Sequence, residues 1–276
     1  MTVDTCFPVK NAGMWLPKFL SELDRVKGLG RVIVSYGVSN DNTIDVLKKW
    51  SKETSLEVEV YLDPVKMKAM SSATIGLLYQ DYQKIITDTS SCSHILMPDS
   101  DLVKLPKNLV DVLLKHDKDI IAPYPYVYLH DKPCRLFYDS HCYRKSGYRF
   151  HPLKPPRNNG QLIQLDSVGT CMLVKRKPFL DTPYSDPYPH MKFCDESRAK
   201  GYEVWADPST VVWHLDVPRL GLESHAQHEI LVAAAKGDPN PMSHASMVPY
   251  IRDDGSTVTP IEIILDIINA YVYGRV

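Results

Sequence analysis

The sequence predicts an α/β fold built on a mostly parallel sheet flanked by helices, with a small helical extension at the C-terminus. Short apolar runs alternate with amphipathic stretches over residues 3–124, which is the order of a doubly wound sheet with right-handed crossovers. Residues 93–101 begin with an apolar run too short for a helix, which predicts a buried strand. Polar residues follow this run directly, as they do where parallel strands end at a binding site.

The elements of the first half are predicted from their periodicity. Residues 3–9 predict a strand, and Leu16, Phe19, Leu20 and Leu23 then share one helical face. Residues 39–43 supply N-cap side chains for a second helix. Residues 56–62 alternate apolar and polar side chains, which predicts an edge strand with one wet face. The other predicted elements here are strands at 31–37, 93–97 and 119–124 and helices at 73–87 and 106–114.

The regular pattern stops over residues 126–164, which are rich in Tyr, Arg, Lys, His and Pro. A loop this long is a functional lid or a disordered segment, and its aromatic residues favour a binding lid over residues 126–160. Two domains are expected, an α/β domain at 1–220 and a helical extension at 221–276 whose last helix packs on the domain or on a second copy of the chain. The remaining predicted elements are strands at 165–175, 202–207 and 211–214 and helices at 191–201 and 260–273.

Composition narrows the class of protein. A net charge of −1 over 276 residues gives no electrostatic argument for nonspecific binding to nucleic acids or membrane surfaces. The six cysteines follow no zinc-ligand spacing and are interpreted as reduced thiols. The N-terminus lacks the features of a signal peptide, and no apolar run is long enough to span a bilayer. The expectation is therefore a cytoplasmic globular protein.

Asp99 and Asp101 stand one residue apart at the end of the strand at 93–97. Two such carboxylates repel each other unless a cation lies between them, and oxygen ligands favour Mg²⁺ or Mn²⁺, ions that commonly carry a diphosphate. The alternative is a simple turn, because Pro-Asp-Ser-Asp is also favourable turn chemistry. His214 ends another apolar run and is either a structural histidine or part of the same site.

Five motifs in this order resemble those of GT-A glycosyltransferases, in particular family 2 enzymes. Residues 7–11 resemble the first nucleotide loop, residues 39–43 the S-x-D-x-T turn, and residues 98–101 the DxD motif. Residues 166–169, and 193–208 with 212–214, are similar to the acceptor-side segments of this superfamily, including its fungal mannan-polymerase branch and glycosyltransferase-like proteins of viruses and bacteria. The resemblance covers residues 3–217.

The resemblance implies a metal-dependent transfer of a sugar from a UDP- or GDP-linked donor to a saccharide, protein or modified-nucleobase acceptor. It makes His214 the third ligand of Mn²⁺ or Mg²⁺ beside Asp99 and Asp101. The residues expected at the nucleotide are Pro8, Val9, Asn11, Tyr36, Asp41, Asp99 and Ser100, and the candidate catalytic residues are Asp139, His190 and Asp195.

Two departures from the family pattern bear on mechanism. Tyr36 and Gly37 stand where family 2 enzymes often have an aspartate for the nucleoside, and Pro189-His190 replaces the Glu-Asp pair whose aspartate serves as the base in inverting members. Retention of the anomeric configuration is therefore expected. The alternatives are a nucleotidyltransferase, which is disfavoured because no glycine-rich phosphate loop is found, and a nucleotide-sugar-binding protein without turnover.

Overall fold

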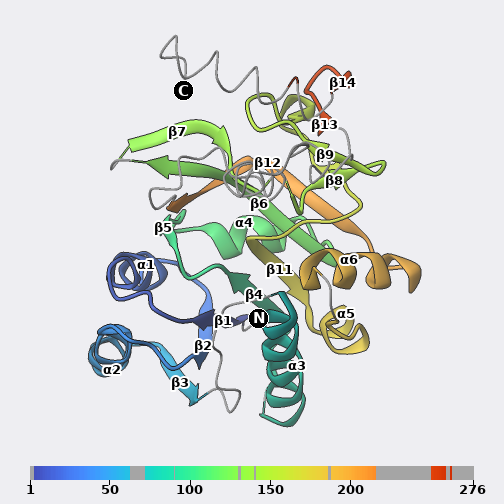
Figure 1. Cartoon of the computed structure of the whole chain (residues 1–276). Helices are drawn as coiled ribbons and strands as arrows, with labels where there is room; N and C mark the ends of the chain where they lie inside the picture. Colours follow the sequence, from blue (N-terminus) through green and yellow to red (C-terminus); the bar gives the residue numbers. More distant parts are fainter. Residues whose placement is uncertain are drawn as a thin grey trace, which may run out of the picture.

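The computed structural model describes residues 3–62, 72–89, 91–129, 132–139, 141–185, 188–215, 250–258 and 262. These residues form a ten-stranded sheet in the order β10-β12-β6-β11-β4-β1-β2-β3, with β5 and β7 attached to β12 and β6 (Figure 1). Its strands are β1 (Val3–Val9), β2 (Leu29–Tyr36), β3 (Glu57–Leu62), β4 (His94–Pro98), β5 (Leu102–Lys104), β6 (Ile120–Leu129), β7 (Lys132–Phe137), β10 (Ile163–Gln164), β11 (Cys171–Lys175) and β12 (Val204–Leu215).

The sheet is mixed but mostly parallel, as the sequence predicts. β1, β2, β3 and β4 pair in parallel, and β6 pairs in parallel with β12. β11 lies between β4 and β6 and is antiparallel to both. β4, β6 and β12 therefore run in one direction, and their carboxyl ends meet at one edge of the sheet. β3 ends the strand order, which confirms the predicted edge position.

Helices cover both faces of the sheet because the side chains of its strands alternate between two cores. Along β2, Val32 and Val34 belong to one core and Ile33 to the other. The first core includes side chains from α1 (Leu16–Leu23), α2 (Thr43–Glu53) and α4 (Leu109–Lys115). The second core includes side chains from α3 (Ser72–Thr89), α5 (Arg176–Asp181) and α6 (Pro189–Ala199). None of the described helices combines the length and apolar character that crossing a bilayer requires.

The segment expected to be a long lid is largely structured. Within residues 126–164 the chain forms the end of β6, β7, β8 (Arg144–Lys145), β9 (Tyr148–Phe150), the 3-10 turn η1 (Asn158–Gly160) and β10. Phe137, Tyr143 and Phe150 are buried and pack edge-to-face or tilted against one another, with centroids 5.0–5.8 Å apart. The expectation that these aromatics form a binding surface was therefore wrong for these three, which belong to the core.

A second, four-stranded sheet follows the order β14-β13-β9-β8. β13 (Tyr250–Ile251) pairs in parallel with β9, and β14 (Thr257–Val258) pairs with β13. The described part of the predicted C-terminal extension therefore contributes strands to this small sheet. The predicted helix at 260–273 lies outside the described residues, apart from residue 262.

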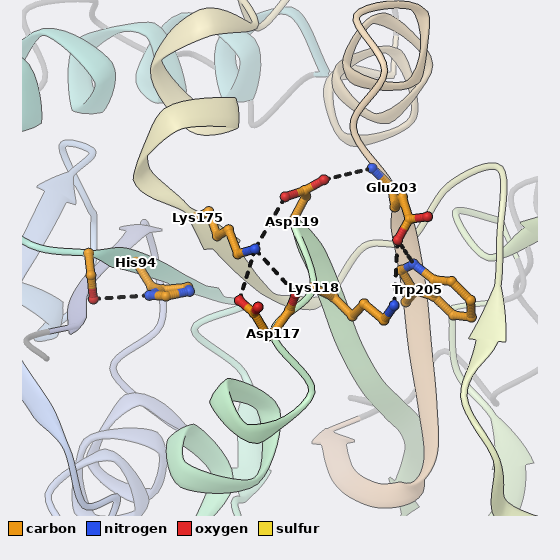
Figure 2. A network of polar contacts seen from close by, with 8 residues as sticks. His94, Asp117, Lys118, Asp119, Lys175, Glu203 and Trp205 are labelled. Carbon is orange, nitrogen blue, oxygen red and sulfur yellow. Dashed lines mark hydrogen bonds and ion pairs between the residues drawn. The ribbon is translucent and has the colours of Figure 1, made fainter.

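A network of ion pairs joins the ends of β11, β6 and β12 at the edge opposite the carboxyl ends of β4 and β12 (Figure 2). Lys175 Nζ lies 2.9 Å from Asp117 Oδ1 and 3.4 Å from Asp119 Oδ1. Lys118 Nζ lies 3.5 Å from Glu203 Oε2 and 4.2 Å from the centre of the Trp205 ring. Each of the three carboxylates faces one of the two lysines, which indicates a structural role for this edge of the sheet.

Candidate metal centre

Three strands bring Asp99, Asp101 and His214 together at the carboxyl edge of the sheet. Asp99 directly follows β4, and its backbone N–H donates to the carbonyl of Thr170 at 2.7 Å. The backbone carbonyl of Asp101 accepts a hydrogen bond of 2.9 Å from the Leu215 N–H. β5 also pairs Leu102 with His214 of β12. Backbone hydrogen bonds therefore fix Asp99 against Thr170 and Asp101 against the end of β12.

The three side chains form a compact cluster of ligand atoms. His214 Nε2 lies 2.8 Å from Asp101 Oδ1 and 3.9 Å from Asp99 Oδ2. One ligand atom from each residue lies within 4.8 Å of the other two. His214 is 3% exposed, and the Tyr138 ring stacks on it at a centroid distance of 3.5 Å and an interplanar angle of 12°. The imidazole is therefore held in one orientation toward the carboxylates.

The electrostatics of this cluster fit a divalent cation. Burial, followed by the charge of Asp101, raises the pKa of Asp99 well above its ordinary value. Burial lowers the pKa of His214, but the Asp101 and Asp99 carboxylates outweigh it and raise this pKa overall. A bound cation would favour the deprotonated forms of Asp99 and His214. Two carboxylates and an imidazole are a donor set that suits Mn²⁺ or Mg²⁺.

Thr170 forms hydrogen bonds with both Asp99 and Asp139. No sequence pattern pointed to this residue. It has a φ of 53°, which is unusual for a β-branched residue and typical of positions under functional constraint. Its hydroxyl donates to Asp139 Oδ2 at 2.8 Å, while its carbonyl accepts from Asp99 N–H. The neighbouring small-residue turn at Gly169 was the available signal, since an added Cβ there would collide with Asp139 and Cys142.

Asp139 lies beside the candidate metal ligands. Its carboxylate is buried and accepts hydrogen bonds from Thr170 and from the Cys142 backbone N–H at 3.1 Å. Burial raises its pKa, and its charge in turn contributes to the raised pKa of Asp99. Among the three candidate catalytic residues, Asp139 is thus coupled to the metal ligands electrostatically and through Thr170.

His190 and Asp195 lie on α6 in different environments. His190 packs against the rings of Tyr79 and Tyr184, at centroid distances of 5.0 and 6.1 Å. Burial lowers its pKa to about 4, so the imidazole is neutral at physiological pH. Asp195 is exposed and its Oδ1 lies 2.9 Å from Arg198 on the same helix. Asp195 is therefore paired with Arg198, and neither His190 nor Asp195 belongs to the cluster of Asp99, Asp101 and His214.

Most of the residues expected at the nucleotide lie at the carboxyl ends of β1 and β2 or in the loops that follow these strands. Pro8 and Val9 pair with Ser35 and Tyr36 at the carboxyl ends of these parallel strands. Asn11 Oδ1 accepts the Asn40 N–H at 2.9 Å, and Asp41 accepts the Gly13 and Thr43 N–H groups at 2.9 and 3.0 Å. Burial raises the pKa of Asp41, but its hydrogen bonds from Thr43 and Gly13 outweigh this and lower it.

These hydrogen bonds connect the loop after β1 to the loop after β2. Both loops lie at the same edge of the sheet as Asp99, because β1, β2 and β4 are parallel. Ser100 lies half-buried in the turn between the two aspartates.

The sequence matches no protein-family model and no curated protein. Among solved structures, it is similar to GalNAc-T7 with UDP, GalNAc and Mn²⁺, with a TM-score of 0.58, 12% identity, and 85% of this chain and 48% of that one covered. It is also similar to the mannosyltransferase PcManGT of Pyrobaculum calidifontis in complex with GDP-Man and Mn²⁺, with a TM-score of 0.55, 12% identity, and 87% and 66% covered. TarS of S. aureus gives a TM-score of 0.50, 14% identity, and 85% and 39% covered.

These similarities establish the fold. The chain has the GT-A fold of nucleotide-sugar glycosyltransferases, which confirms the fold expected from the motifs. It spans less than two thirds of the length of the three structures described.

Proposed function

We propose that this chain is a metal-dependent glycosyltransferase that moves a sugar from a UDP- or GDP-linked donor to an acceptor. The observation that carries this proposal is the cluster of Asp99, Asp101 and His214 at the carboxyl edge of a GT-A sheet. Two of the similar structures hold Mn²⁺, one with UDP and one with GDP-mannose, which supports a cation and a nucleotide at this edge. Ligands of open α/β sheets bind at this same edge.

The side chains of the cluster would hold Mn²⁺ or Mg²⁺ against the donor diphosphate. A bound cation neutralises the charge that develops on the diphosphate as it leaves. His214 is held by Tyr138 and by the pairing of β5 with β12, so its nitrogen is positioned before the metal arrives. Pro8, Val9, Asn11, Tyr36, Asp41 and Ser100 form the nucleotide side of the site in this proposal, beside Asp99.

Retention of the anomeric configuration is part of the proposal. An inverting transfer needs a base opposite the leaving group, and His190 stands where inverting relatives carry an aspartate. His190 is neutral but packed between two tyrosine rings. In a retaining transfer, the departing diphosphate oxygen takes the acceptor proton on the same face of the sugar, so no base is required at position 190. Asp139, at the metal ligands, is then the carboxylate placed to position the reacting groups.

Donor turnover tests the activity. The purified chain is incubated with a panel of UDP- and GDP-sugars, with Mn²⁺ or with EDTA, and release of the nucleoside diphosphate is measured. We expect slow hydrolysis of one donor with Mn²⁺ and none with EDTA, and loss of that turnover in Asp99→Asn.

Asp117→Asn is the matched control, because Asp117 is an exposed aspartate of the opposite edge (Figure 2). Metal-dependent donor binding without release of the diphosphate would instead identify a binding protein. Hydrolysis that persists in EDTA would contradict the metal-dependent mechanism.

A further inference from the structure

Two arginines face each other on the small sheet that follows Asp139 in the chain. Arg144 of β8 is paired directly with Arg149 of β9 in an antiparallel ladder. Directly opposed residues of such a ladder project from the same face of the sheet. Like charges placed in this way repel each other, so the pair requires an explanation beyond strand formation.

Arg149 is the more unusual of the two because it is buried. It is 3% exposed, and its Nε and Nη1 atoms are inaccessible to solvent and have no hydrogen-bond acceptor in the part of the chain that the structure describes. A guanidinium has five donors and no acceptor, and leaving buried donors unpaired is strongly unfavourable. Buried guanidinium donors without acceptors are typical of a binding site whose ligand is absent.

Arg144 adds a second cation at the same place. It is half-buried, and its Nε donates to the carbonyl of His141 at 3.3 Å. Burial and then the charge of Arg149 lower its pKa, which agrees with two cations in close proximity. The charge of Asp195 offsets this only in part.

Two described carboxylates close to Arg144 are paired with another arginine. Asp166 accepts the Gly147 N–H at 2.6 Å and lies 3.4 Å from Arg198, and Asp195 lies 2.9 Å from the same arginine. Neither acid forms an ion pair with Arg144 or Arg149. Among the described residues, neither arginine forms an ion pair with a carboxylate, whereas each carboxylate of the network at the opposite edge of the main sheet faces a lysine (Figure 2).

Hydrogen bonds connect this arginine pair to the metal centre. The Cys142 N–H donates to Asp139 Oδ1, and the Ser167 hydroxyl donates to the Cys142 carbonyl at 2.5 Å. The Arg144 N–H then donates to the Ser167 carbonyl at 3.2 Å. Arg144 is thus held in a fixed relation to Asp139, which itself contacts Thr170 and lies beside Asp99.

We propose that Arg144 and Arg149 form a subsite for an oxyanion group of the acceptor, a phosphate or a carboxylate. This inference rests on the proposed function, in which the metal takes the charge of the donor diphosphate. The anion at the arginine pair then belongs to the second substrate. Guanidinium groups match the planar or tetrahedral oxygens of such groups in a bidentate manner, which makes arginine suited to this recognition.

Binding of inorganic phosphate in EDTA tests the subsite without any metal. Titration calorimetry of the wild-type chain is compared with Arg149→Met and with Arg144→Gln, which removes the less buried cation and keeps the test open if Arg149→Met fails to fold. Lys145→Gln is the matched control, because Lys145 is the next residue of β8 and is exposed. We expect each arginine variant to weaken phosphate binding about tenfold or more and the control to leave it unchanged. Equal affinity in Arg144→Gln and wild type, or no saturable binding by the wild type, overturns the proposal.

An acceptor panel separates the two sources of the anion and the two proposals. The donor that the wild type turns over is supplied with Mn²⁺. A sugar phosphate, a uronic acid and a neutral sugar are then offered as acceptors to the wild type and to Arg144→Gln. Preference for the sugar phosphate or for the uronic acid identifies the group, and loss of that preference in Arg144→Gln confirms the subsite. Equal use of all three acceptors by the wild type overturns the subsite and leaves the proposed function intact. Phosphate binding in EDTA together with no metal-dependent donor binding overturns the proposed function alone.

Discussion

The hydroxyl of Thr170 is expected to stabilise the protein through its hydrogen bond to Asp139. The substitution Thr170→Val removes this hydroxyl while keeping a β-branched side chain of the same shape. In the structure this hydroxyl donates to the buried Asp139 carboxylate at 2.8 Å, and Thr170 itself is 4% exposed. A hydrogen bond to a charged group contributes roughly 1.5–3 kcal/mol, so we expect Thr170→Val to lower the free energy of unfolding by about 2 kcal/mol. For a chain of this size that corresponds to a fall in melting temperature of about 4–8 °C.

Thr170→Ser is the matched variant because it keeps the hydroxyl. It loses one buried methyl group, which costs about 1 kcal/mol, but serine tolerates the left-handed backbone better than a β-branched residue. We therefore expect its stability to lie within about 1 kcal/mol of the wild type. Thermal and urea unfolding are measured in EDTA, so that metal binding does not contribute. A Thr170→Val variant as stable as the wild type, or more stable than Thr170→Ser, would refute the role assigned to the hydroxyl.

Three further predictions concern the metal, the nucleotide loops and the stereochemistry. Mn²⁺ affinity should fall as the pH is lowered from about 8 to about 6, because His214 must lose its proton to bind metal and its pKa is raised above 6.5. Titrations of Mn²⁺ at several pH values check this, and an affinity that does not change with pH contradicts it. Asp41→Ala should lower the free energy of unfolding by about 1–2 kcal/mol, since Asp41 accepts two backbone N–H groups, whereas the exposed Asp45→Ala should cost less than about 0.5 kcal/mol; equal urea midpoints would argue against the loop contacts. His190→Ala should reduce the transfer rate less than about tenfold with retention seen by NMR of the product, whereas inversion with a loss of about 10²–10⁴-fold would make His190 the base.

The parallel half of the sheet was predictable because its signals are local. Each strand from β1 to β4 is a continuous or alternating apolar run, and each intervening helix shows a single apolar face. The two aspartates at the end of β4 were recognisable for the same reason, since an apolar strand that ends in carboxylates is a local pattern. His214 also ended an apolar run, but its contact with Asp101 depends on the pairing of β5 with β12.

The features that escaped prediction depend on contacts between distant segments. β8 and β9 have two and three residues, too few for a period to be visible, and their aromatic neighbours are buried only because β6 and β7 cover them. The antiparallel direction of β11 follows from the path of the preceding segment. Thr170 and Tyr138 acquire their roles from side chains more than thirty residues away. From the sequence alone Arg149 is an ordinary strand residue, and only its burial in the structure distinguishes it.

Titration of Mn²⁺ followed by electron paramagnetic resonance tests the central claim most directly, because the signal of free Mn²⁺ falls as the ion is bound. The wild-type chain, Asp101→Asn, His214→Ala and the control Asp117→Asn are titrated with and without UDP and GDP. The account predicts one bound ion in the wild type and the control, tighter binding with one of the two nucleotides, and an affinity at least about tenfold weaker in Asp101→Asn and His214→Ala. Equal Mn²⁺ affinity in the wild type and in folded Asp101→Asn would contradict the assignment of this cluster as the metal centre.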